Sequence, residues 1–361
     1  MAGRRNIYYW KSDRAFASEN TRTTAGSPLV DVGFQLRNYL NRFFRQGLIH
    51  IEPFHGQGNH ITFVARYADS DYFIRLENGP EADNYMAVES AVMKMVREQG
   101  IPCPIIYHTD VSRRMVPFAI QVMELVSSRD LNHHNGTNKL DVKHIAFEIG
   151  AYIAKWQAVK PPNFGLFDVD TVLNAGTLLG YHKRYSDYFH LNLENHLDFL
   201  VSANFLSTAK KKHILALIDD HEPLLHLNQG CLVHKDLAFW NILSDGKHIH
   251  AFIDWDDAVS GDPVDDLSLL ACFHPGDVVA SAISGYEHVS PSPDHFEKRF
   301  WLHLLRNMIF KAVIRVRGNY FDMPGDFFMN NGQTNNLKRF TLARIESACE
   351  GLRDKKDILS L

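Results

Sequence analysis

The sequence has few of the features that mark secreted, membrane-spanning or zinc-binding proteins. It contains only four cysteines, which lie far apart and form no Cys-x-x-Cys pair, so neither a zinc site nor a disulfide framework is expected. No run approaches the roughly eighteen apolar residues that a spanning helix needs, and the first residues lack the apolar stretch of a signal peptide. We therefore expect a cytoplasmic protein that has no membrane partner.

A strong excess of one charge is also missing. The 38 Lys and Arg residues nearly balance 42 Asp and Glu residues, the net charge is -4, and no basic stripe dominates, so no nucleic-acid partner is expected. The 20 histidines include no His-x-x-x-His spacing beside a carboxylate, which argues against a histidine metal site. With 45% hydrophobic and 22% charged residues over 361 positions, the chain is typical of a globular protein larger than one average domain.

What the sequence does contain is a set of polar residues with the spacing of a phosphoryl-transfer site. Asp236 and Asn241 lie five positions apart, and Asp254 follows Asp236 by eighteen positions, at the end of an apolar run. Phosphoryl transfer needs a carboxylate beside the attacking hydroxyl and oxygen ligands for the magnesium ions that bridge the nucleotide phosphates. The spacing therefore indicates a phosphotransferase.

The residues around this pattern make it more specific. Leu232-Val233 and Ile242-Leu243 are short apolar runs typical of strands on both sides of a loop. A turn signal at 244–247 then precedes His248 to Ile253, in which apolar residues alternate as in a half-buried strand. A strand, loop, strand, turn and strand that end at Asp254 form the scaffold that this chemistry requires.

The same segment resembles the aminoglycoside phosphotransferase and choline kinase family, the small-molecule branch of the protein-kinase-like fold. The resemblance covers His-x-Asp-x-x-x-x-Asn at 234–241, Ile-Asp-Trp at 253–255 and Gly-Asp-Pro-x-x-Asp-Leu at 261–267. It implies that Asp236 orients or deprotonates an acceptor hydroxyl, that Asn241 and Asp254 hold Mg²⁺, and that ATP, with GTP as a possibility, is the donor. Asp266 is then expected to bond backbone amides of the loop, and His234 to anchor it.

The sequence departs from the family pattern in two ways. Lys235 stands where the family usually has glycine, and Ala238, Phe239 and Trp240, with the bulky pair Phe239-Trp240, stand where it has small or polar residues. The pair could alter the acceptor pocket or simply pack against the lobe, and we favour packing.

The N-terminal half supplies candidates for the nucleotide site. The stretch 54–64 predicts a strand, a turn with Gly56 and Gly58, and a second strand, and glycines let backbone amides approach phosphates. By the resemblance, Arg75 takes the place of the phosphate-pairing lysine of protein kinases, and Glu89, on a helix expected over 84–98, pairs with it.

A second apolar strand, over 118–126, matches the hinge between lobes in the same family. The resemblance implies that backbone groups of Glu124 and Val126 bond the adenine edge there. Backbone hydrogen bonds leave no trace in the side chains, so an ordinary core strand reads the same way.

We predict an α+β protein with a two-lobed protein-kinase-like fold, in which a small N-terminal sheet lobe precedes a larger, mostly helical C-terminal lobe. Residues 1–28 are polar and are expected to form a loosely packed arm, residues 29–126 the nucleotide-binding lobe, and residues 127–361 the catalytic and substrate-binding lobe.

The acceptor is expected to be a small molecule with a hydroxyl group, bound by a monomer or homodimer. In the resembled family, helices inserted before the catalytic loop and at the C-terminus build the acceptor pocket, and here residues 178–205 are rich in tyrosines and carboxylates. With Asp256 and Asp257 they favour an aminoglycoside or another amine-bearing polyol. The alternatives are a kinase of a neutral metabolite such as a sugar, a protein kinase, or an inactive kinase-like binding module.

Overall fold

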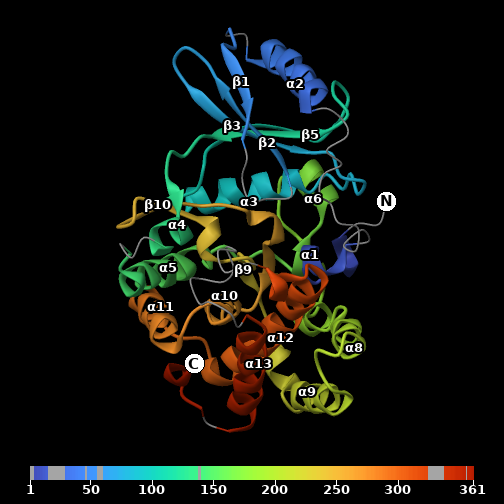
Figure 1. Cartoon of the computed structure of the whole chain (residues 1–361), viewed down its shortest axis with the longest axis vertical. Coiled ribbons are helices and arrows are strands. Elements are labelled where there is room, and N and C mark those ends of the chain that lie inside the picture. Colours follow the sequence, from blue (N-terminus) through green and yellow to red (C-terminus); the bar gives the residue numbers. More distant parts are fainter. Residues whose placement is uncertain are drawn as a thin grey trace.

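The structure, a computed structural model, describes residues 4–14, 29–44, 47–54, 60–136, 140–323, 337–354 and 356–361. They form two lobes, a smaller one built on an antiparallel sheet and a larger one that is mostly helical (Figure 1). This is the two-lobed α+β architecture that the sequence predicts.

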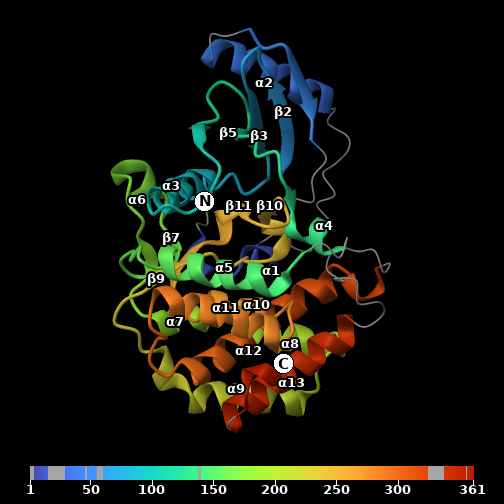
Figure 2. The ribbon, with the colours of Figure 1, turned by 90° about the vertical axis from the view of Figure 1, so that its left-hand side faces the viewer.

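The smaller lobe is a five-stranded antiparallel sheet with the strand order β1-β2-β3-β5-β4. Its strands are β1 (His50–Pro53), β2 (Ile61–Arg66), β3 (Asp71–Glu77), β4 (Ile106–Asp110) and β5 (Ala119–Glu124), and its helices are α2 (Leu29–Phe43) and α3 (Met86–Glu98). Leu36 and Tyr39 of α2 share a buried core with Phe63 and Ile74 of the sheet. Helix α3 lies between the sheet and the larger lobe (Figures 1 and 2), and the chain crosses between the lobes at 125–128.

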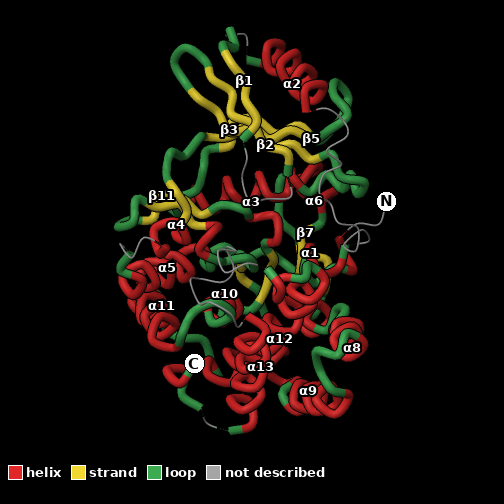
Figure 3. Tube along the Cα trace, in the orientation of Figure 1, coloured by secondary structure: helices red, strands yellow, loops and turns green. Residues whose placement is uncertain are grey.

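The larger lobe consists mainly of helices and also contains two small antiparallel sheets of short strands, β11-β10-β6 and β8-β7-β12-β9 (Figure 3). Its helices are α1 (Trp10–Asp13), α4 (Leu131–Gly136), α5 (Val142–Trp156), α6 (Val169–Ala175), α7 (Tyr185–Phe189), α8 (Leu193–Ser202), α9 (Thr208–Asp220), α10 (Asp265–Leu270), α11 (Gly276–Val289), α12 (Phe296–Arg317) and α13 (Leu337–Arg353). Its strands are β6 (Arg129–Asp130), β7 (Phe164–Phe167), β8 (Gly180–His182), β9 (Cys231–Val233), β10 (Ile242–Ser244), β11 (Ile249–Phe252) and β12 (Val259–Gly261). Single 3-10 turns are η1 (Arg4–Asn6), η2 (Glu222–Leu225), η3 (Phe239–Asn241), η4 (Trp255–Asp257), η5 (Tyr320–Asp322) and η7 (Ile358–Ser360).

Two glycines allow α5 and α11 to pack backbone against backbone. A Cβ atom at Gly150 would lie 1.8 Å from the carbonyl oxygen of Ala282, and one at Gly285 would lie 1.9 Å from that of Phe147. Any side chain at either position would push the pair apart. In the described part of the chain, no helix combines the length and the apolar character that crossing a membrane requires.

The strands predicted around the catalytic loop are present, and they belong to two different sheets. Strand β9 pairs with β12, whereas β10 lies between β11 and β6. The loop 234–241 runs from the first sheet to the second, and Asp254 follows β11, the partner of β10. The pairing of β10 with β11 therefore brings the two ends of the motif together.

Residues 4–14 correct the expectation of a loosely packed N-terminal arm. Tyr8 and Tyr9 are each 1% exposed and stack on Tyr188 and Phe310 of the larger lobe. The expectation weighed the polar composition of residues 1–28 as a whole, but the aromatic run at 8–10 supplies enough apolar surface to bind the segment to the protein. Residues 1–3 and 15–28 lie outside the described part of the chain.

Candidate active site

One buried carboxylate holds the loop between β9 and β10. Asp266 accepts hydrogen bonds from the backbone N–H of His234 at 2.9 Å and of Lys235 at 3.0 Å, and from the Trp156 indole at 3.2 Å. Nε2 of His234 lies 3.1 Å from the carbonyl oxygen of Ile253, which joins the loop to the end of β11. The predicted structural roles of Asp266 and His234 are confirmed.

Lys235 faces away from the site. Its backbone adopts a left-handed conformation with φ 68°, which a glycine takes without strain. Its buried ammonium group donates to Asp265 at 2.6 Å, to Asn307 at 3.0 Å and to the Tyr8 hydroxyl at 2.9 Å. Lys235 therefore ties the loop to α10, α12 and the N-terminal segment.

Asp236, the predicted catalytic residue, lies beneath two lysines. It is 1% exposed. Nδ2 of Asn241 donates to the backbone carbonyl oxygen of Asp236 at 2.8 Å and to Oδ2 of Asp236 at 3.1 Å. Lys311 of α12 approaches Oδ1 at 2.8 Å and Lys11 of α1 approaches Oδ2 at 3.5 Å. Burial acts to raise the pKa of Asp236, but Lys311 and Lys11 hold it well below its ordinary value, so the carboxylate is ionised at neutral pH.

The two residues predicted to hold magnesium line one cavity. Because the amide nitrogen of Asn241 points at Asp236, its amide oxygen is left for a cation. Asp254 adopts φ 66° and ψ 58°, a strained left-handed conformation that recurs at functional sites. Burial and the neighbouring Asp256 raise the pKa of Asp254, an effect that a divalent cation would oppose. One amide oxygen and one carboxylate are hard ligands of the kind that Mg²⁺ takes from proteins.

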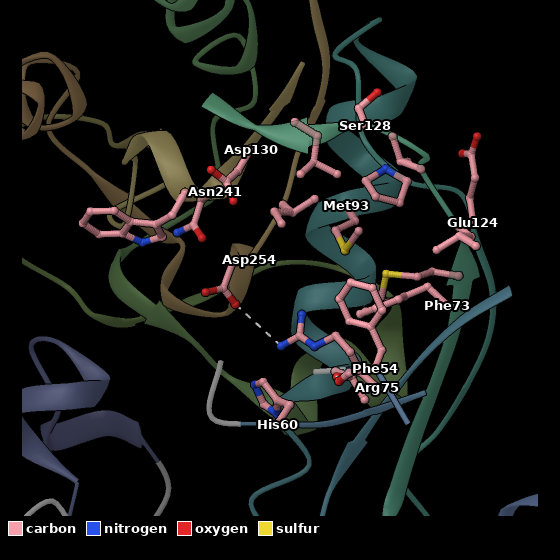
Figure 4. Close-up of a pocket in the computed structure, with 18 of the residues that line it drawn as sticks. Phe54, His60, Phe73, Arg75, Met93, Glu124, Ser128, Asp130, Asn241 and Asp254 are labelled. Carbon is pink, nitrogen blue, oxygen red and sulfur yellow. Dashed lines mark hydrogen bonds and ion pairs between the residues drawn. The ribbon is translucent and has the colours of Figure 1, made fainter. Parts of the chain in front are cut away.

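Arg75 connects the smaller lobe to Asp254, one of the two predicted metal ligands. Its Nη1 donates to Glu89 of α3 at 2.5 Å, and its Nη2 lies 3.6 Å from Oδ1 of Asp254 (Figure 4). The predicted pairing of Arg75 with Glu89 is thus present. Burial acts to lower the pKa of Arg75, but both carboxylates raise it above its usual range. Arg75 is therefore a fixed cation beside Asp254.

A cavity of about 400 Å³ separates the lobes at this point (Figure 4). Phe73, Met93 and Met123 give it an apolar wall, and Asn241 and Asp254 lie at its other end. The lining also includes Phe54, His60, Thr62, Arg75, Pro104, Glu124, Leu125, Val126, Ser128, Arg129, Asp130, Trp240, Leu243 and Ile253. An apolar slot with polar groups at one end suits a flat base that carries a charged tail.

The structure describes the residues of the predicted hinge but not those of the predicted glycine turn. Glu124 and Val126 line the cavity, as expected. The backbone N–H of Glu124 already donates to the carbonyl of Ile105 at 2.9 Å, so a base would use the Val126 N–H or a carbonyl oxygen. Gly56 and Gly58, in the predicted turn, lie outside the described residues. The roles of all four in nucleotide binding stay predictions.

The two bulky residues of the catalytic loop take different places. Phe239 is buried against the His274 ring, with centroids 4.1 Å apart, as packing predicts. Trp240 packs against Phe273 and also lines the cavity. Only one of the pair is therefore confined to packing.

The N-terminal segment contributes groups that sequence reasoning missed. Lys11 reaches Asp236, and the backbone N–H of Trp10 donates to Oδ1 of Asp257 at 3.1 Å. Arg4 donates to Asp83 at 2.6 Å and to the carbonyl oxygen of Asp256. The signal in the sequence was Tyr8-Tyr9-Trp10, an aromatic run in an otherwise polar stretch.

Several residues of the region 178–205, predicted to form the acceptor pocket, have other places in the structure. Tyr185, Tyr188 and Phe189 are core residues, each at most 1% exposed. Asp187 and Asp198 form surface ion pairs with neighbouring basic residues. Helix α7 presents its aromatic rings to the core. The sequence did not distinguish this arrangement from a pocket wall, because buried helices and pocket walls have similar compositions.

Asp257, predicted to attract an amine, is buried against the N-terminal segment. Burial raises its pKa to about 8, and the neighbouring Asp256 and Asp236 add to the effect. Its negative charge near neutral pH is thereby reduced.

Comparison with known proteins places this geometry in context. Residues 50–299 match the family described as the phosphotransferase enzyme family. A sequence search of curated proteins finds no match.

Solved structures share the fold over most of their length. A thermostable mutant of the aminoglycoside phosphotransferase APH(4)-Ia, in a ternary complex with AMP-PNP and hygromycin B, is 14% identical, with a TM-score of 0.62, over 88% of this chain and 98% of that one. A putative fructosamine-3-kinase from Haemophilus somnus 129PT is 14% identical, with a TM-score of 0.59, over 87% and 99%. The macrolide 2'-phosphotransferase MphH from Brachybacterium faecium is 16% identical, with a TM-score of 0.55, over 89% and 98%.

Proposed function

The chain belongs to the phosphotransferase enzyme family and is a small-molecule kinase, and from this premise we propose that it transfers the γ-phosphoryl group of ATP to a hydroxyl group with Asp236 as the catalytic residue. The observation that carries the proposal is the bond between Asn241 and Asp236. It joins a residue that lines the cavity to the buried carboxylate, so a nucleotide phosphate in the cavity would lie beside Asp236.

The residues present divide the work of phosphoryl transfer. Arg75 binds nucleotide phosphates, and Asn241 and Asp254 hold Mg²⁺, which supplies neutralising charge when bound. Asp236 orients the acceptor hydroxyl. As the hydroxyl oxygen bonds to the γ-phosphorus, the bond from that phosphorus to the bridging oxygen breaks, ADP leaves, and the hydroxyl proton passes to Asp236. Because its pKa is low, Asp236 takes the proton late, as a loose transition state allows.

An amine-bearing polyol, including an aminoglycoside, is the first acceptor class that we propose. Asp254 lines the end of the cavity, and Asp256 lies next to it with its carboxylate 4.0 Å from the ring of His60, another lining residue. Carboxylates attract ammonium groups. A neutral polyol such as a sugar is the second, and it is favoured by a specific observation. Lys11 and Lys311 already surround Asp236 with positive charge, which disfavours an amine placed next to the reacting hydroxyl.

Two further alternatives receive less support. A protein kinase needs a platform for its peptide, but the seven residues between Asp254 and Asp262 form η4 and β12 and are nearly all buried. An inactive binding module has no reason to keep Asp236, Asn241 and Asp254 together.

The experiment has two steps. Thermal unfolding is measured with ADP and with ATP, each with and without magnesium, for the wild type and for Asp254→Ala; Asp277→Ala, an exposed aspartate on α11, is the matched control. We expect magnesium-dependent stabilisation that Asp254→Ala abolishes and Asp277→Ala keeps. Amine-bearing, neutral and anionic hydroxyl compounds are then incubated with MgATP and analysed by mass spectrometry for one added phosphoryl group. Absence of nucleotide stabilisation in the wild type would contradict the proposed function.

A further inference from the structure

Asp236 has two lysine neighbours that differ in kind. Lys311 is 3% exposed and 2.8 Å from the carboxylate, the length of a strong charge-assisted hydrogen bond. Its ammonium also lies over the Tyr9 ring, 4.8 Å from the centroid. Lys11 is 35% exposed and lies 3.5 Å from the carboxylate, beyond that length. Lys311 therefore holds Asp236 in place, whereas Lys11 is held loosely and can be reached by solvent.

Lys11 also lies where phosphate charge would develop. Its ammonium lies 3.5 Å from Oδ2 of Asp236. Burial acts to lower the pKa of Lys11, but the carboxylates of Asp236 and then Asp254 raise it. On the proposed function, a phosphoryl group in transit would lie between Asp236 and Asp254. The loop's own lysine, Lys235, is fully buried and committed to Asp265, so it cannot supply charge there.

The segment that carries Lys11 is anchored on both sides. The Arg4 guanidinium lies between the rings of Trp10 and Tyr85, at 3.8 and 3.7 Å from their centroids, and pairs with Asp83. At the other end, the buried Asp13 lies 2.5 Å from His196. Such anchoring fixes the backbone of α1, whereas the side chain of Lys11 is partly exposed to solvent.

Resting on the proposed function, we propose that Lys11 is a catalytic residue, supplied by the N-terminal segment, whose ammonium group binds the transferring phosphoryl group. As the bond to the leaving ADP breaks, negative charge spreads over the three outer oxygens of that group. A positioned cation stabilises this charge more in the transition state than in the ground state, which is the requirement for catalysis. Lys11 keeps its protons throughout.

The test compares ligands that lack and contain the transferring group, so it does not need the acceptor. Dissociation constants are measured for MgADP alone and for MgADP with aluminium fluoride, which mimics the phosphoryl group in transit. Lys11→Met should bind MgADP within about twofold of the wild type but bind the fluoride complex about tenfold to a hundredfold more weakly. Lys11→Arg should recover part of this loss. The control is Lys143→Met, which replaces an exposed lysine that pairs with Asp277 and should change neither dissociation constant.

Each other outcome has a defined meaning. Equal weakening of both complexes, or no weakening of either, overturns the role of Lys11 while leaving the proposed function in place. Tighter binding by Lys11→Met overturns it as well, because Lys11 would then obstruct the site. Lys11→Gln repeats the comparison should the methionine variant unfold. Failure of the wild type to bind MgADP overturns the proposed function itself.

Discussion

The proposed nucleotide side and the proposed acceptor side of the site are built from different parts of the chain. On the nucleotide side, β3, α3, β5 and the ends of β10 and β11 surround an open cavity. On the acceptor side, Asp236 is covered by α1 and α12, which lie more than 200 and about 70 residues away from it in the sequence. The residues of the nucleotide side lie in or near recognisable sequence motifs. The acceptor side is formed by contacts between segments that are far apart in the sequence.

This difference separates the groups proposed to act on the nucleotide from those that surround Asp236. Arg75, Glu89 and Asp254 form one connected set of charges beside the cavity. The residues over Asp236 come from the N-terminal segment and from α12, and neither lines the cavity.

The largest effect is expected from a substitution of Asp236, which should impair phosphoryl transfer but not nucleotide binding. Asp236→Asn should lower turnover by roughly a hundredfold to ten-thousandfold, the range for a positioned acid or base. It should leave nucleotide binding intact, because Asp236 does not line the cavity. Turnover and MgADP affinity are measured side by side, with the exposed Asp277→Asn as control. Near wild-type turnover on a verified acceptor would show that Asp236 is not the catalytic residue.

The second prediction tests whether the N-terminal segment is part of the folded core. Lys235→Met leaves Asp265 buried without its cation and removes a bond to Tyr8, so it should lower the free energy of unfolding by about 3–5 kcal/mol. Urea unfolding measures the loss. Lys143→Met, which removes an exposed ion pair, should hardly change stability. A similarly small change for Lys235→Met would mean that the buried pair does not bind the loop to the segment.

The third prediction addresses the nucleotide side. Arg75→Ala should raise KM for the nucleotide and also lower kcat, because the guanidinium holds phosphates in both the ground state and the transition state. A combined loss of about tenfold to a hundredfold in kcat/KM corresponds to a charged hydrogen bond. Arg66→Ala, in the neighbouring strand but paired on the surface, serves as control. If the two variants behave alike, Arg75 does not contact the nucleotide.

The smallest expected effect depends on pH. Burial acts to raise the pKa of Asp13, but hydrogen bonds, above all with His196, lower it to about 2. An unfolded aspartate has a pKa of about 3.9, so Asp13 should contribute about 2 kcal/mol of stability above pH 4, and this should vanish as the pH falls towards 2. Asp13→Asn should therefore be less stable than the wild type at pH 7, and the gap should narrow by pH 3. Asp198→Asn, at an exposed pair, should show no such gap. A gap that is constant with pH would contradict this account.

The sequence predicts well which residues of the proposed nucleotide side come together, because the relevant information is local. Asn241 and Asp254 lie thirteen residues apart, and the alternation at 248–253 places Asp254 at a strand end. Arg75 and Glu89 are fourteen residues apart, on a strand and the helix that follows it. Each of these relations follows from strand and helix periodicity.

The acceptor side could not be predicted in the same way. Nothing near Lys11 or Lys311 in the sequence indicates that both approach Asp236, since that meeting depends on how α1 and α12 pack. The tyrosines at 185 and 188 misled because aromatic residues fill cores and pockets alike. Only the aromatic run before Lys11 hinted that the first residues are bound to the protein.

A crystal structure with MgADP and aluminium fluoride tests the central claim most directly. We predict that the nucleotide base occupies the cavity between Met93 and Met123, that magnesium contacts Asn241 and Asp254, and that the fluoride group lies between the β-phosphate and Asp236 with Lys11 in contact. A nucleotide bound elsewhere, or a fluoride group beyond the reach of Asp236, would contradict the account.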